Sequence, residues 1–153
     1  MIRRIVYLVI AFVALTASAA QSYDWSQYKP TTVAAALSRT RVIKGNDYTV
    51  ELDNIKYVVE AVYSGEHREM GVKRRELLRQ WVEVPGHAKQ DAEQDVQFRA
   101  GAQLIWVSLQ NGLLKPFTEE AKAGSKLRLY VTYIGADGED RVFVVNRFEV
   151  SAR

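Results

Sequence analysis

The chain has 153 residues, no cysteine, and 21 basic against 18 acidic side chains. Without cysteine it has no disulfide, no thiol nucleophile, no thiolate metal site and no cysteine that could carry a lipid. If Arg3 and Arg4 leave with a leader, 19 basic residues face 18 acidic ones and the charge falls to about +1, which argues against nucleic acid or an anionic membrane surface as a partner.

The first twenty residues have the pattern of a secretory signal peptide. Arg3 and Arg4 precede an apolar run from Ile5 to Leu15, and small residues follow up to Ala20. The run is shorter than the roughly 20 residues of a spanning helix, and the small residues suit a signal peptidase. We expect residues 1–20 to be cleaved after Sec-type export to the periplasm or the extracellular medium, leaving no membrane span.

Residues 21–40 are predicted to form an N-terminal arm. The arm carries Tyr23, Trp25 and Tyr28, and Pro30 permits a short helix after it. The aromatic side chains either pack onto the domain or face a partner. Packing is the commoner fate of such rings, and we favour it here.

Residues 41–153 are predicted to form a single β-rich domain. Runs of β-branched and aromatic residues separated by turn formers predict strands, and an apolar stripe with a period of 3.6 predicts a helix. The polar stretch 87–95 is expected to be loop or frayed helix. The predicted strands are 42–43, 48–52, 55–63, 96–99, 104–109, 126–134 and 141–150, and the predicted helices are 72–84 and 111–123, the second with its regular part beginning near Pro116.

This order of elements favours a small OB-like antiparallel barrel. A helix placed before a C-terminal hairpin of two long strands is the arrangement of the five-stranded OB-fold. An SH3-like barrel, or an open α+β sheet packed by two helices, would give nearly the same order. The prediction is therefore a mainly β fold with two helices, with the OB-like barrel as first choice.

A basic cluster around the first helix supplies the candidate binding residues. Arg68, Arg74, Arg75 and Trp81 combine guanidinium and indole groups that can hold sugars or anions. Interleaved glutamates favour instead a salt-bridged, solvated helix face. In an OB-fold this segment borders the binding groove opposite the acidic turn 135–140. That mixed rim favours an envelope protein or a neutral or zwitterionic ligand.

The sequence offers no assigned catalytic residues, cofactor site or metal site. His67 and His87 are predicted in loops on either side of the first helix, and they match no known ligand spacing. We expect an exported, non-catalytic binding or accessory module of the bacterial cell envelope. The alternative is a small envelope hydrolase that uses paired carboxylates, and the oligomeric state is left open.

Overall fold

The computed structural model describes residues 23–40, 48–138 and 140–151. The predicted strand at 42–43 lies outside the described residues. Within them no helix is long and apolar enough to cross a membrane. In chain order the elements are η1 (Trp25–Gln27), β1 (Lys29–Pro30), α1 (Val33–Arg39), β2 (Tyr48–Val50), β3 (Lys56–Glu69), α2 (Val72–Glu83), β4 (Ala92–Ala100), β5 (Gln103–Gln110), η2 (Asn111–Leu113), α3 (Leu114–Glu120), β6 (Lys126–Asp137) and β7 (Asp140–Val150).

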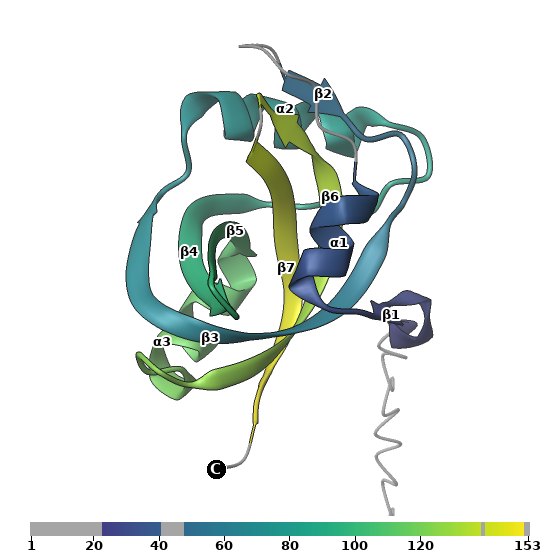
Figure 1. The fold of residues 1–153 in the computed structure, drawn as a ribbon. Coiled ribbons are helices and arrows are strands. Elements are labelled where there is room, and N and C mark those ends of the chain that lie inside the picture. The colour runs from purple at the N-terminus through teal and green to yellow at the C-terminus, as the bar shows by residue number, and fades with distance from the viewer. Residues whose placement is uncertain (1–22, 41–47, 139, 152–153) are drawn as a thin grey trace, which may run out of the picture.

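Five of these strands close into a barrel (Figure 1). The ring runs β3–β4–β5–β7–β6 and closes through pairing of β6 with β3, with β5 and β7 parallel and the other neighbours antiparallel. α3 lies between the third and fourth barrel strands, as in an OB-fold. The predicted OB-like barrel with a helix before the C-terminal hairpin is therefore confirmed.

β3 is longer than the sequence predicts, because Gly65 does not end it. The first half of the strand pairs with β6 and the second half with β4, and the register shifts between Tyr63 and His67. Gly65 has φ +99, a backbone conformation that glycine adopts without strain. The glycine therefore marks a bulge that bends one strand around the barrel, and His67 lies in a strand and not in a loop.

The main core fills the inside of the barrel. Alternation along β6 turns Leu127, Leu129 and Val131 inward, as the period-2 pattern of that strand predicts. Helices α1 and α3 add Val33 and Phe117 to the same core.

A second core lies between α2 and the outer face of the barrel, towards the upper end in Figure 1. Leu77 and Trp81 of the helix pack against Ile134, Val142 and Val144. The helix at 72–84 is confirmed to within one residue, and its apolar stripe covers part of the face formed by β6 and β7.

The boundaries of β4 and of the helix near Pro116 also differ from prediction. β4 begins at Ala92, inside the stretch expected to be loop or frayed helix, because polar residues that face outward are tolerated on a strand whose other face is buried. The helix predicted at 111–123 is a 3-10 turn followed by the shorter α3, with Pro116 in its first turn as expected.

Candidate functional site

The N-terminal arm packs onto the barrel through its aromatic residues. Asp24 caps η1 by accepting a hydrogen bond from the backbone N–H of Ser26, and Tyr28 after it is 3% exposed. Trp25 and Tyr28 both contact Tyr130 of β6, with ring centroids 5.3 and 5.6 Å apart in edge-on geometry. The packed state predicted for the arm is thus the observed one.

The arm continues as β1, which adds a short parallel strand to β3 before Thr32 caps α1. Because the chain must turn into the helix at Thr32, β1 covers only two residues of its partner. This early departure leaves a groove between the arm and the barrel.

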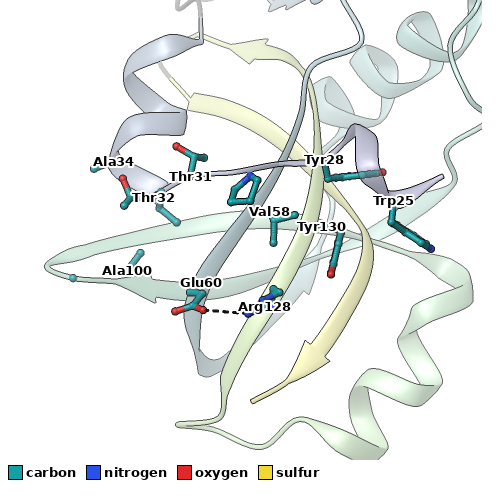
Figure 2. Close-up of a pocket in the computed structure, with 13 residues that line it drawn as sticks. Trp25, Tyr28, Thr31, Thr32, Ala34, Val58, Glu60, Ala100, Arg128 and Tyr130 are labelled. Atoms are coloured by element: carbon teal, nitrogen blue, oxygen red, sulfur yellow. Dashed lines mark ion pairs between the residues drawn. The ribbon is translucent and has the colours of Figure 1, made fainter. Parts of the chain in front are cut away.

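The groove has a cavity volume of about 830 Å³ (Figure 2). Its floor is the outer face of two paired strands, where Val58 lies opposite Tyr130 and Glu60 opposite Arg128. Arm residues 25–34 form one wall, and the turn at Ala100 and Gly101 closes the other side. Sites that bind small molecules or peptide side chains are commonly of this volume and largely apolar.

The charged groups at the groove balance one another. Glu60 and Arg128 form an ion pair at 3.9 Å, drawn as the dashed line in Figure 2, and both side chains are half-exposed or more. Arg128 also lies 3.7 Å from Glu149, which pairs with Arg147 at 2.6 Å. Because these two acidic and two basic groups cancel, the rim presents opposite charges side by side without a net field.

Two cationic side chains, Arg147 and Lys56, lie against the aromatic rings that line the groove. Arg147 lies over the rings of Trp25 and Tyr130, at 5.1 and 5.0 Å from their centroids. Lys56 is buried next to Tyr28 and donates a hydrogen bond to Gln27 at 2.7 Å. Burial, together with the hydrogen bond to Tyr23, raises the pKa of Tyr28, so its hydroxyl stays protonated.

Two of the residues predicted to bind ligand lie in the interior. Trp81 is 0% exposed in the second core, where its ring stacks on His87 at 4.1 Å. Arg74 is 5% exposed and donates to Asp95 at 2.8 Å. Trp81 does not reach the surface, whereas Arg74 and Arg68 both line a pocket of about 440 Å³ beside α2. Ligand binding by the four residues stays a prediction.

The other two predicted residues lie on different surfaces. Arg75 is exposed on α2. Arg68 lies on β3, where its guanidinium stacks on Trp106 at 4.1 Å and its Nε donates to Asp95 at 3.3 Å. The four candidates therefore do not form one patch, and Trp106, which the sequence reasoning missed, is the aromatic partner of Arg68.

Two ionisable side chains outside the groove, Asp95 and His87, have their polar atoms occupied. Asp95 is fully buried and accepts from Arg68, Arg74 and the hydroxyl of Ser108. His87 has both ring nitrogens within 3.0 Å of backbone carbonyl oxygens. Among the described residues, no group of three or more acidic or histidine side chains is placed to hold a metal ion.

Comparison with known proteins finds similar solved structures. No family model matches the sequence, and no curated protein matches it. A crystal structure of a mitochondrial single-stranded DNA-binding protein from S. cerevisiae is similar, with a TM-score of 0.35, 16% identity, 64% of this chain covered and 94% of that chain covered.

That similarity corrects one expectation. The near-neutral charge argues against nucleic acid as a partner, whereas this neighbour is a single-stranded DNA-binding protein. The expectation that nucleic acid is not a partner is therefore contradicted, and we withdraw it. The likeness itself concerns the fold and assigns no ligand to this chain.

Proposed function

We propose that this protein is an exported, non-catalytic binding module of the bacterial cell envelope, and that its ligand occupies the groove between the arm and the barrel. The groove carries the proposal, because it combines about 830 Å³ of volume with an aromatic lining from Trp25, Tyr28 and Tyr130. The signal-peptide pattern of residues 1–20 supports export.

The chemistry of the groove favours binding over catalysis. Its two charged side chains, Glu60 and Arg128, pair with each other at an exposed rim. General acid–base work by carboxylates calls for a buried acid with a shifted pKa near a second acid. The buried carboxylate of the described chain, Asp95, has its oxygens occupied by arginine and serine donors, so no observation favours the hydrolase alternative.

Titration with defined probes tests the location of the site. Uniformly ¹⁵N-labelled protein is titrated with a pool of short random peptides, with a chitin hexasaccharide and with oligothymidine. Backbone amide shifts confined to residues 58–60 and 128–130 would support the groove.

Two aromatic variants make the test specific. Tyr130→Ala removes the aromatic ring of the groove floor and is expected to weaken binding about tenfold or more, the scale of a lost buried aromatic contact. Trp106→Ala is the matched control, because it removes a half-buried ring from the β4–β5 face outside the groove. Sensitivity to Trp106→Ala with none to Tyr130→Ala would place the site on the β4–β5 face and overturn the proposal.

A further inference from the structure

One edge of β3 is left without a strand partner along the groove. On that edge β1 pairs with β3 as far as Val58, and β4 takes over from Val62. Glu60 lies between these two positions, and it pairs with Arg128 of β6 on the opposite edge. The described chain therefore offers a short gap in an otherwise covered strand.

The backbone of Glu60 points into that gap. The carbonyl of Val58 accepts a hydrogen bond from the N–H of Thr31 at 2.9 Å, so it faces the side of β1. Successive residues of a strand direct their N–H and C=O groups to alternate edges. Two residues further on, the N–H and C=O of Glu60 face the same side as the carbonyl of Val58, into the space between Thr31 of the arm and the turn at Ala100 and Gly101.

We propose that the groove binds an extended segment of another polypeptide, which pairs with the β3 edge at Glu60 and places an apolar side chain against Tyr130. This inference rests on the proposed function and names its partner class. A strand presents an N–H and a C=O at the spacing that a free edge requires, and pockets beside the edge then select side chains.

The charges at the rim agree with a peptide that carries no net charge. Glu60 and Arg128 lie 3.9 Å apart and cancel, and Glu149 and Arg147 beside them cancel as well. The backbone amides of a peptide are neutral and carry both donors and acceptors. An alternation of apolar and polar side chains would put apolar groups on Tyr130 and Val58 and polar groups in solvent.

Selection from a peptide library tests the inference. Random peptides of about ten residues, long enough for one strand, are displayed and selected on the purified protein, and dissociation constants of the enriched peptides are measured by fluorescence anisotropy. Glu60→Pro removes the backbone N–H at position 60, and a strand accepts proline where its N–H faces an unpaired edge. Glu60→Ala is the matched control, because it removes the side chain and keeps the backbone N–H.

The expected result separates the contribution of the Glu60 backbone to peptide binding from that of its side chain. Loss of one edge hydrogen bond should weaken binding about tenfold in Glu60→Pro and by at most about threefold in Glu60→Ala. Hydrogen exchange of the Glu60 amide should slow when an enriched peptide is bound. This second measurement uses the unaltered protein and decides the question if Glu60→Pro fails to fold.

The outcomes distinguish the inference from the proposed function. Unchanged exchange at Glu60, or a saccharide or oligothymidine filling the groove while no peptide is enriched, would overturn the peptide inference and leave the groove as a binding site. Peptides that bind regardless of both Glu60→Pro and Tyr130→Ala would overturn both.

Discussion

Arg74 donates a hydrogen bond to Asp95 at 2.8 Å, and both side chains are almost wholly removed from solvent. The same carboxylate accepts from the hydroxyl of Ser108 at 2.7 Å and from Arg68, whose side chain is half-exposed. One buried acid thus ties together α2, β3, β4 and β5. A charge placed in this way depends on its partners, because water cannot replace them.

Asp95→Ala should therefore destabilise the protein strongly. The substitution leaves Arg74 buried without a counter-charge, for which a cost of about 3–5 kcal/mol in the free energy of unfolding is typical. Urea unfolding followed by circular dichroism measures it. Arg75→Ala, one position along α2 and exposed, is the control and should stay within about 0.5 kcal/mol of the unaltered protein. A loss below about 1 kcal/mol in Asp95→Ala would show that solvent reaches the pair and would contradict its burial.

Gly135→Ala should disturb the contact between β2 and β6. Gly135 has φ +145, and a Cβ atom built there would lie 2.0 Å from the carbonyl oxygen of Thr49. Separating the strands to make room should cost about 1–3 kcal/mol and speed hydrogen exchange in Tyr48–Val50. Gly112→Ala is the control, since nothing lies within 4 Å of its Cβ position. Equal stability of the two variants would mean that β2 is not held against Gly135 in solution.

The carboxyl of Glu76 should titrate well below its ordinary range. Hydrogen bonds from Arg79 and Gln80 lower its pKa to about 2 from 4.5. Since the pKa is lower in the folded state, the stabilisation is complete above about pH 4.5 and is lost as the pH falls through 2. An NMR titration of the carboxyl carbon measures the value. Arg79→Gln should move it back toward 4.5 and Arg75→Gln should leave it in place; a Glu76 carboxyl unaffected by Arg79→Gln would refute the pairing.

Alternation along the chain was enough to predict the barrel but not the path of β3. Tyr57 and Val59 alternate with outward residues as a barrel strand requires, and the burial follows that pattern. Gly65 looked like a strand end because glycine is as common in turns as in bulges. Which of the two it forms depends on pairing with β4 and β6, and local sequence does not contain that information.

Two neighbouring arginines among the predicted binding residues also show where prediction from the sequence stops. Arg74 and Arg75 are identical in chemistry, yet one is buried and the other exposed. Helical spacing contains the signal that separates them, because Arg74 precedes Leu78 by four residues and so lies on the apolar face. The groove is a harder case, since Trp25 and Tyr130 meet only through the register of β3 against both β1 and β6.

Export should be visible as removal of the leader. Expressed in a Gram-negative host, the protein should be recovered from the periplasm or the medium with a mass that lacks residues 1–20 and an N-terminus at Gln21. The expectation follows from the signal-peptide pattern of the apolar run and of the small residues before Gln21. Leu8→Arg places a charge in the apolar run and should leave the uncleaved chain in the cytoplasm. Tyr23→Ala, outside the leader, should be exported and processed like the unaltered protein. A mature mass that still includes residues 1–20 would instead identify the segment as an uncleaved anchor, and the groove would then face its ligand while tethered to the membrane.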